Sequence, residues 1–141
     1  MIKVKITGVD RTIKYLNGLR IKLPKAINMS TEEIANNINR TAKMLVRYRT
    51  RYGGKTPGNL TRNIHTIKSD EGDFTVIAES FYAGYVEYGT KAHEIPNAFG
   101  RKITVSHPGA KPMFFMRDAV QQTVEEATGI IERRVREALK G

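Results

Sequence analysis

The chain has 141 residues, no cysteine, 40% hydrophobic and 27% charged residues, which fits one globular domain over residues 1–141 and argues against wholesale disorder. Without cysteine, disulfides and thiolate metal sites are excluded and an intracellular location is favoured, and no apolar run approaches the roughly 20 residues of a membrane span. The net charge of +10 is uneven: residues 1–69 hold 15 Lys and Arg against 3 Asp and Glu, and residues 70–141 hold 9 against 11. We therefore expect the first half to face a polyanion or an acidic protein, unless it is a solvated basic helix surface.

The first half of the chain predicts a short strand and then helix. Residues 2–6 alternate Ile and Val with lysine, which is typical of a strand. Residues 9–19 have helical spacing that Asn17 and Gly18 weaken, and Pro24 fits the first turn of a second, longer helix. The apolar face that this longer helix is expected to bury comprises Ile27, Ile34, Ile38, Ala42 and Leu45.

The middle of the chain predicts a turn and a β-hairpin. Residues 53–59 are rich in glycine and contain Pro57, which is typical of a turn. Residues 64–68 and 74–78 are β-prone runs separated by five polar residues, which predicts an antiparallel hairpin.

The second half predicts a short helix, a loop, a strand and a long helix. Residues 82–88 are expected to wind into one or two helical turns that Gly89 ends. Phe81, Tyr85 and Tyr88 would share one face of these turns, and Tyr82 and Val86 another. Residues 91–102 read as an extended excursion or flexible loop, and residues 103–105 as a third core strand.

A long amphipathic helix is predicted from Met116 onward. Its expected core-facing positions are Val120, Val124, Ala127, Ile131, Val135 and Ala138. Together these elements predict an α+β domain, in which the long N-terminal amphipathic helix and the C-terminal helix pack on one face of a small antiparallel sheet. The other sheet face would stay exposed in a monomer.

Catalytic chemistry finds little support in the sequence. The potential metal ligands His65, His93, His107, Glu87 and Glu94 have no HExxH spacing, and no serine lies in a G-x-S-x-G elbow. The GGKTPG stretch lacks the spacing of a phosphate-binding loop. We expect no enzyme activity, no metal and no cofactor; a hydrolase or toxin would have to act through His93 or His107.

Nucleic-acid binding is the stronger alternative. A basic and aromatic run ends the first long helix and continues into the glycine-rich turn, where Tyr48 and Tyr52 provide stacking faces. The candidate contacts with DNA or with an acidic partner are Arg47, Arg49, Arg51, Lys55 and Arg62. No sequence-specific binding motif accompanies them, and basic residues at a helix C-terminus are favoured by the helix dipole in any case.

Two aromatic stretches point instead to a contact surface. The sequence YAGYVEYGT, at residues 82–90, combines tyrosines with small residues that allow close approach, and HPGAKPMFF, at residues 107–115, delivers two phenylalanines to the last helix. Tyrosine offers a large contact area with a polar tip, which suits a protein interface. The alternative is that Tyr85, Val86 and Phe115 seal the core.

These motifs resemble the gene-product-ten-like tail-completion, or head–tail connector, family of long-tailed bacteriophages. The matching features are the long first helix, the Pro-Gly turn and Leu at residues 56–64, the Tyr-Ala-x-Tyr-Val-Glu-Tyr-Gly-Thr pattern at residues 82–90, and the entry to the last helix at residues 111–119. The chain departs from the family pattern in having Thr-Pro-Gly for Asp-Thr-Gly, Asn63 for serine, and Met113 between Pro112 and Phe114.

The resemblance implies a non-enzymatic virion or prophage protein at the head–tail junction, made in the host cytoplasm. It implies assembly with itself as a ring, hexamers included, and contacts with head-completion or connector proteins and with tail-tube proteins. No membrane partner is expected, and DNA would be near without being read. The expected interface, besides the loop at residues 91–102, comprises Tyr82, Tyr85, Glu87, Tyr88, Gly89, Thr90, His93 and Phe114. The alternative function is that of a small basic nucleic-acid-binding protein.

Overall fold

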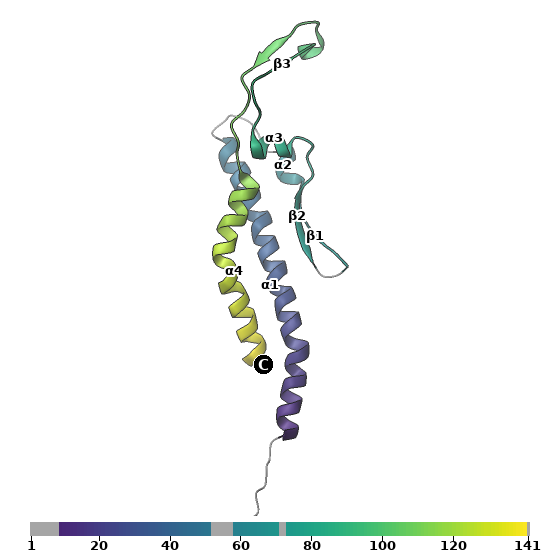
Figure 1. The fold of residues 1–141 in the computed structure, drawn as a ribbon, viewed down its shortest axis with the longest axis vertical. Coiled ribbons are helices and arrows are strands. Elements are labelled where there is room, and N and C mark those ends of the chain that lie inside the picture. The colour runs from purple at the N-terminus through teal and green to yellow at the C-terminus, as the bar shows by residue number, and fades with distance from the viewer. Residues whose placement is uncertain (1–8, 52–57, 71–72, 141) are drawn as a thin grey trace, which may run out of the picture.

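Two long antiparallel helices form the body of the molecule (Figure 1). The computed structural model of the chain describes residues 9–51, 58–70 and 73–140, without the side chains of residues 9–12, 50, 51 and 99. Helix α1 spans Val9–Arg51 and helix α4 spans Phe115–Lys140. At about 1.5 Å per residue the helices are about 65 Å and about 39 Å long, so α4 covers only part of α1.

Helix α1 is continuous, so the prediction of two separate helices is wrong. Pro24 lies inside α1 and not in the first turn of a second helix, and Asn17 and Gly18 do not interrupt it. An interior proline removes one backbone hydrogen bond and costs about 3 kcal/mol. Because Pro24 is exposed, water can bond the carbonyl group that the proline leaves unpaired. The predicted strand at residues 2–6 lies outside the described residues.

The predicted apolar face of α1 is buried only toward its C-terminal end. Ala42 and Leu45 are buried, whereas the side chain of Ile27 is 54% exposed. Closer to the N-terminus the buried side chains are small, namely Ala26 and Ser30, and the Ser30 hydroxyl donates a hydrogen bond to the Ala26 carbonyl at 2.8 Å. The face of α1 that is covered therefore changes along the helix.

The predicted hairpin is confirmed. Strands β1 (Ile64–Lys68) and β2 (Phe74–Ala78) pair antiparallel, with Ile64 opposite Ala78. Along both strands, buried or half-buried side chains on the face toward α1 alternate with exposed side chains on the opposite face. The sheet face that is turned away from α1 is therefore uncovered, as predicted. Asn39 of α1 fixes the hairpin by donating hydrogen bonds to the Ile64 carbonyl at 3.3 Å and to the Thr66 hydroxyl at 3.1 Å.

The core lies where α1, α4 and the β1–β2 hairpin meet. Helix α2 (Gly58–Arg62) closes one side of it, so residues 58 and 59 begin a helix where the sequence predicted a turn; residues 52–57 lie outside the described residues. The buried side chains that form the core are Ala42, Leu45, Val46, Leu60, Ile64, Ala83, Phe115 and Ala119.

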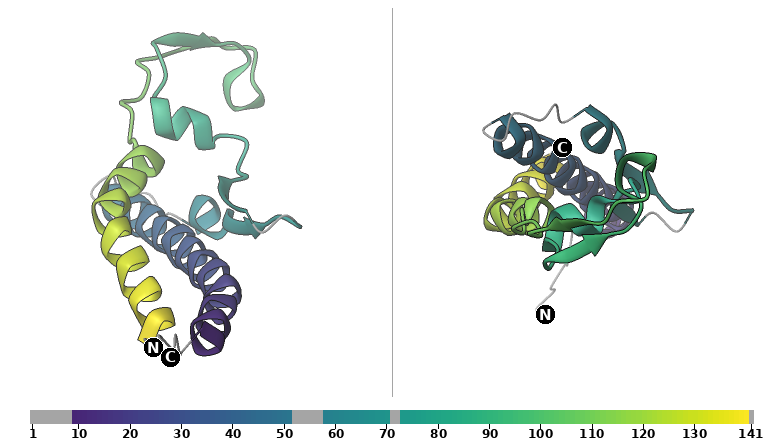
Figure 2. Two further views of the ribbon diagram at one scale, coloured as in Figure 1. Left: turned by 60° about the horizontal axis from the view of Figure 1, so that its bottom comes forward. Right: turned by 90° about the horizontal axis from the view of Figure 1, so that it is seen from above.

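A second hairpin projects from the end of the body where α4 begins (Figures 1 and 2). It consists of β3 (His93–Ile95), the 3-10 turn η1 (Ala98–Gly100) and β4 (Val105–His107), with His93 opposite His107. Residues 91–102, predicted as an extended excursion or flexible loop, form most of this projecting hairpin, whereas the prediction of a third core strand at residues 103–105 is wrong. Strand β4 pairs only with β3 among the described strands, and Ile103 is 47% exposed.

Helix α4 buries only part of the predicted stripe, since Ala127, Val135 and Ala138 are half-buried. Its buried side chains are Phe115, Ala119, Thr123 and Ile130. The predicted core positions Val120, Val124 and Ile131 are 40%, 60% and 42% exposed. The buried side chains and the exposed Val120, Val124 and Ile131 lie on adjacent sides of α4, and only the first of these sides is covered.

The α+β class is confirmed. The long N-terminal helix and the C-terminal helix contact each other, and α1 also contacts the strands of the first hairpin. The strands form two separate two-stranded sheets where a single small sheet was expected. Because β3 and β4 lie beyond the helices, only β1 and β2 belong to the packed body.

Candidate functional site

Residues 81–88, which include helix α3 (Ala83–Tyr88), place their large side chains on two sides. Phe81, Tyr85 and Tyr88 are 91%, 63% and 76% exposed, whereas Tyr82 and Val86 pack against the core. The predicted sharing of faces is therefore confirmed. The alternative in which Tyr85 seals the core is wrong, although Phe115, at 1% exposed, does so.

Glu87 caps the N-terminus of α4. Its two carboxylate oxygens accept hydrogen bonds from the backbone N–H groups of Met116, at 2.9 Å, and Arg117, at 3.0 Å. The first N–H groups of a helix have no partner within the helix, and the helix dipole favours a negative charge there. Because Glu87 is only 7% exposed, its carboxylate joins α3 to α4 and does not reach the surface.

The backbone reinforces this junction. The N–H of Met113 donates to the Val86 carbonyl at 2.9 Å, and the N–H of Phe114 donates to the Glu87 carbonyl at 3.1 Å. Phe114 has a left-handed backbone, with φ of 50°, and its ring lies 3.7 Å below the guanidinium of Arg117. This stacking is a cation–π contact that holds the ring at the start of α4.

An apolar groove of about 520 Å³ lies between α3, β2 and the start of α4. Its lining residues are Ala78, Ala83, Gly84, Glu87, Tyr88, Phe114, Phe115, Met116, Arg117 and Val120. We call this the aromatic groove. Small residues form part of its wall and Tyr88 and Phe114 contribute rings, so its chemistry suits apolar side chains of a protein partner.

Gly89 and Thr90 belong to the neck of the projecting hairpin. Thr90 bridges Ala110 through two backbone hydrogen bonds, of 2.9 Å and 3.0 Å. Gly89 has φ of 74°, and a Cβ atom there would lie 2.5 Å from the Ala110 carbonyl oxygen. Gly109, on the opposite side of the neck, has φ of 86°, and a Cβ atom there would likewise collide with the Thr90 carbonyl oxygen. These glycines let the two chains of the neck approach closely.

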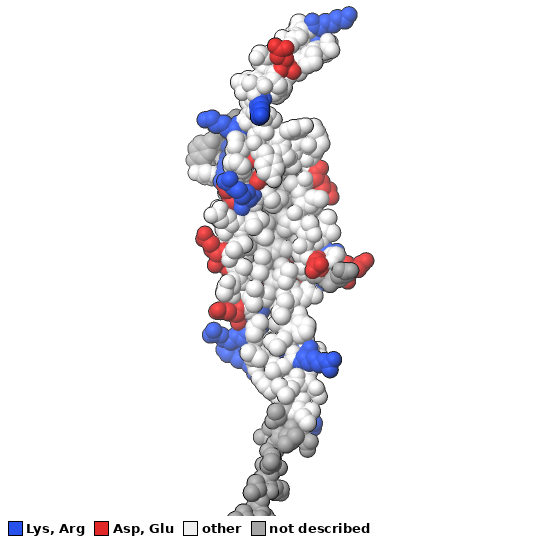
Figure 3. Space-filling view, viewed as in Figure 1, with Lys and Arg blue, Asp and Glu red and all other residues white. Residues whose placement is uncertain are grey.

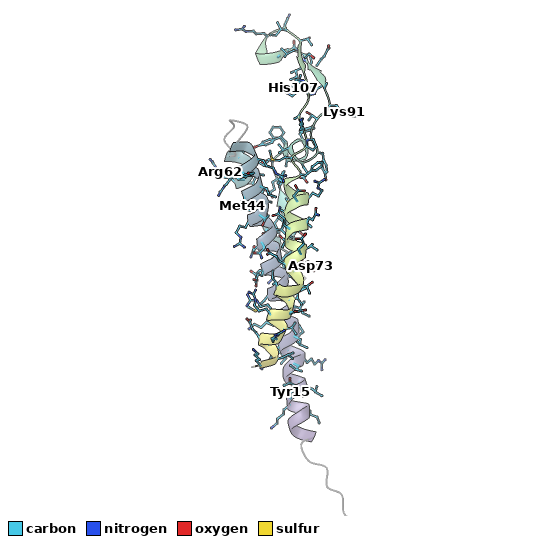
Figure 4. The ribbon with its side chains drawn as sticks, turned by 90° about the vertical axis from the view of Figure 1, so that its left-hand side faces the viewer. Tyr15, Met44, Arg62, Asp73, Lys91 and His107 are labelled. Carbon is cyan, nitrogen blue, oxygen red and sulfur yellow. The ribbon has the colours of Figure 1, made fainter. Side chains whose placement is uncertain are left out.

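The structure separates His93 from the other predicted interface residues. His93 lies on the projecting hairpin, where its ring centroid is 5.1 Å from that of His107 (Figure 4 labels His107). The His107 Nδ1 atom accepts a hydrogen bond from the N–H of Gly109 at 3.0 Å. His65 lies on the other hairpin, 3.8 Å from the Glu79 carboxylate. Within the described part of the chain, no three His, Asp or Glu side chains are grouped as metal ligands.

The predicted basic cluster is divided. Arg49 pairs with Asp118 at 2.7 Å and also donates to the Met113 carbonyl, so it ties α1 to the start of α4. Arg47 instead lines a groove of about 550 Å³ with Arg40, Lys43, Met44 and Tyr48, which we call the basic groove. The exposed Arg62 lies on α2; the Arg51 side chain and Lys55 are outside the described residues.

Sequence reasoning missed one structural role and three members of the basic groove, Arg40, Lys43 and Met44. Arg40 and Lys43 lie seven and four residues before Arg47, a spacing that places all three close together on the helix. The Glu87 cap left no such signal, because its partners lie 29 and 30 residues further along the chain.

Among the described helices, none has the length and apolarity to cross a membrane. Comparisons of the chain with protein-family models, with curated proteins and with solved structures find no match.

Proposed function

We propose that the protein is a structural component of the head–tail junction of a tailed phage or phage-like element and that it acts by assembly. The observation that carries the proposal is the aromatic groove beside exposed Phe81, Tyr85 and Tyr88. Soluble monomers rarely expose such a cluster of large rings without using it, and tyrosine is enriched at protein interfaces. All the lining residues of the groove except Ala78 and Val120 lie in the two stretches, 82–90 and 111–119, that carry the resemblance to the tail-completion family.

The shape of the molecule supports the same proposal. Figure 1 shows an elongated body with a narrow hairpin at one end and the bare N-terminal part of α1 at the other. A ring subunit needs two different, complementary surfaces, because head-to-tail contacts close only by rotation. Under this proposal the partners are further copies of the chain, connector proteins on the capsid side and tail-tube proteins on the other.

The proposal predicts that Tyr85→Ala/Tyr88→Ala folds but fails to complete particles. Both rings are largely exposed, so folding loses little, whereas an interface loses two aromatic anchors. We expect the yield of infectious particles to fall by about tenfold or more in a phage or prophage that lacks its own copy of the gene.

A matched control is Ile67→Thr/Ile77→Thr. It removes two exposed apolar side chains from the outer face of the β1–β2 hairpin while keeping β-branched residues. Its yield should equal that of the unchanged protein. An undiminished yield from the tyrosine variant would overturn the assignment of the aromatic groove.

The basic groove favours nucleic-acid binding as a second candidate function. Arg40, Lys43 and Arg47 gather around the 60% exposed ring of Tyr48, which combines phosphate contacts with a stacking face. This candidate requires that the isolated protein bind duplex DNA or RNA with an affinity that falls steeply with salt. Arg40→Gln/Lys43→Gln should then reduce both the affinity and its dependence on salt.

A further inference from the structure

The N-terminal part of α1 extends beyond the end of α4 (Figures 1 and 4). The helices contain 43 and 26 residues, so the first turns of α1 have no neighbouring helix in the described structure. The last ion pairs between the helices join Glu33 to Arg133 and Arg134. Residues 13–25, which precede the buried Ala26, are here called the arm. Figure 4 labels Tyr15 on it.

The arm exposes several large apolar side chains to solvent. Ile13, Leu16 and Ile21 are 50%, 56% and 74% exposed, and Ile27 just beyond the arm is 54% exposed. Ile13, Leu16 and Ile27 repeat at helical spacing, so they form one apolar stripe. An isolated helix of this length is marginal in water, and helices gain most of their stability by packing such a stripe. The arm therefore requires a partner.

The charge of the arm limits what that partner is. Its four charged residues are Lys14, Arg20, Lys22 and Lys25, all of them basic and exposed. A matching surface has to present apolar side chains of its own and a surplus of carboxylates.

The outer face of α4 has this composition. Residues 118–132 contain four acidic residues and no basic one. Val124 and Ile131 are 60% and 42% exposed there, and Glu125 and Glu132 are exposed beside them. These positions face away from the buried side of α4, which carries Ala119, Thr123 and Ile130. Figure 3 shows acidic side chains along the free edge of α4. We call this surface the acidic strip.

The arm cannot reach the acidic strip of its own molecule. Helix α1 is continuous from Val9 to Arg51, and it leads the arm past the end of α4 and away from the middle of that helix. The two surfaces are complementary but held apart by a rigid helix. Only a second copy can bring an arm to an acidic strip.

We infer that the arm of one copy packs on the acidic strip of the next. This inference rests on the assembly function proposed above and names two of the surfaces that join the copies. Ile13, Leu16 and Ile27 contact Val124 and Ile131, while Arg20, which lies on the same face of α1, reaches Glu125 and Glu132. Because the contact joins two different surfaces, its repetition is of the head-to-tail kind that builds rings.

Complementary charge reversal tests the contact. Arg20→Glu puts an acidic side chain on the contacting face of the arm, and Glu125→Lys/Glu132→Lys puts basic side chains on the facing part of the strip. Each variant alone brings like charges together at the contact, so its self-association, measured by sedimentation velocity in low salt, should be roughly tenfold weaker. In an equimolar mixture the new acidic side chain of the arm variant meets the new basic side chains of the strip variant, and association should return.

Control variants change net charge equally at other exposed sites. Lys68→Glu matches the arm variant, and Asp70→Lys/Asp73→Lys matches the strip variant. Both should associate like the unchanged protein. Circular dichroism checks that all variants keep their helices, since Glu and Lys have similar helix propensity.

The inference is overturned if the unchanged protein stays monomeric, if either reversal leaves association unchanged, or if mixing does not restore it. The proposed function fails separately, through the particle yield of the Tyr85→Ala/Tyr88→Ala variant. Charge reversals without effect, together with loss of particles in the tyrosine variant, would leave the function standing and remove only the arm contact.

Discussion

Single residues of the YAGYVEYGT stretch have different roles although they are neighbours. Tyr85 and Tyr88 face solvent, whereas Glu87 turns inward and caps a helix that begins 28 positions later in the chain. Gly89 follows at once with a backbone that a side chain would obstruct. The motif therefore joins an exposed aromatic surface to the junction that positions it. Its interface role stays a prediction.

Glu87→Ala should destabilise the protein by about 1–2 kcal/mol, because two N–H groups of α4 lose their acceptor. Glu87→Gln keeps an acceptor oxygen and should lose less. Urea unfolding measures both changes, and Glu94→Ala, at an exposed position, is the control. Equal stability of Glu87→Ala and the unchanged protein would contradict the capping role.

The pairing of α1 with α4 is fastened by ion pairs near both ends of the contact. Arg49 binds Asp118 at the start of α4, and Arg133 and Arg134 bind Glu33 near its end. Hydrogen bonds from Arg133 and Arg134 lower the pKa of Glu33 below its ordinary 4.5. A hydrogen bond from Arg49 likewise lowers the pKa of Asp118 below its ordinary 3.8.

These lowered pKa values predict acid sensitivity of the helix pair. In the unfolded chain the two carboxyl groups have ordinary pKa values, so their contribution to stability is complete above 4.5 and 3.8. This contribution to stability is lost as the pH falls from the ordinary pKa of each group through its lowered pKa in the folded protein. Urea unfolding at a series of pH values from neutral into that range measures the loss.

Glu33→Gln/Asp118→Asn should be less stable at neutral pH and should lose less on acidification. Glu125→Gln, which changes an exposed carboxylate of the same helix, should follow the unchanged protein. If the double variant kept the full acid dependence, the two ion pairs would not be its source.

The whole molecule divides into a packed body and a projecting hairpin. The neck at Thr90 and Ala110 is a single bridge, and β3 and β4 make their main contacts with each other. A two-stranded hairpin is at best marginally stable and adds little to the stability of the body. The hairpin extends the molecule beyond the packed body, and Figure 4 labels Lys91 and His107 on this projecting part.

Replacing residues 91–109 by a short Asn-Gly turn should therefore leave the body folded. Because Thr90 and Ala110 already face each other, the turn spans them without rearrangement. The thermal midpoint, followed by circular dichroism, should stay within about 4 °C of the full chain, a shift that corresponds to about 1 kcal/mol. A larger fall would mean that the hairpin supports the body.

The sequence by itself determined what depends on neighbouring residues. The repeat of apolar residues predicted helical structure along α1 and α4, alternation predicted the β1–β2 hairpin, and the spacing of Phe81, Tyr85 and Tyr88 predicted their common face. Helix and strand periods are local properties of the chain, so they can be read without knowing the partners. Pro24 was misread because its local preference was outweighed by the continuous helix around it.

Only the tertiary structure decided which surfaces are covered. Helix α4 offers two apolar stripes, and packing against α1 buried Ala119 and Thr123 while leaving Val124 exposed. The cap by Glu87 and the ion pair of Arg49 with Asp118 likewise join residues far apart in the chain. Such contacts depend on how whole elements approach one another, and no local pattern records that.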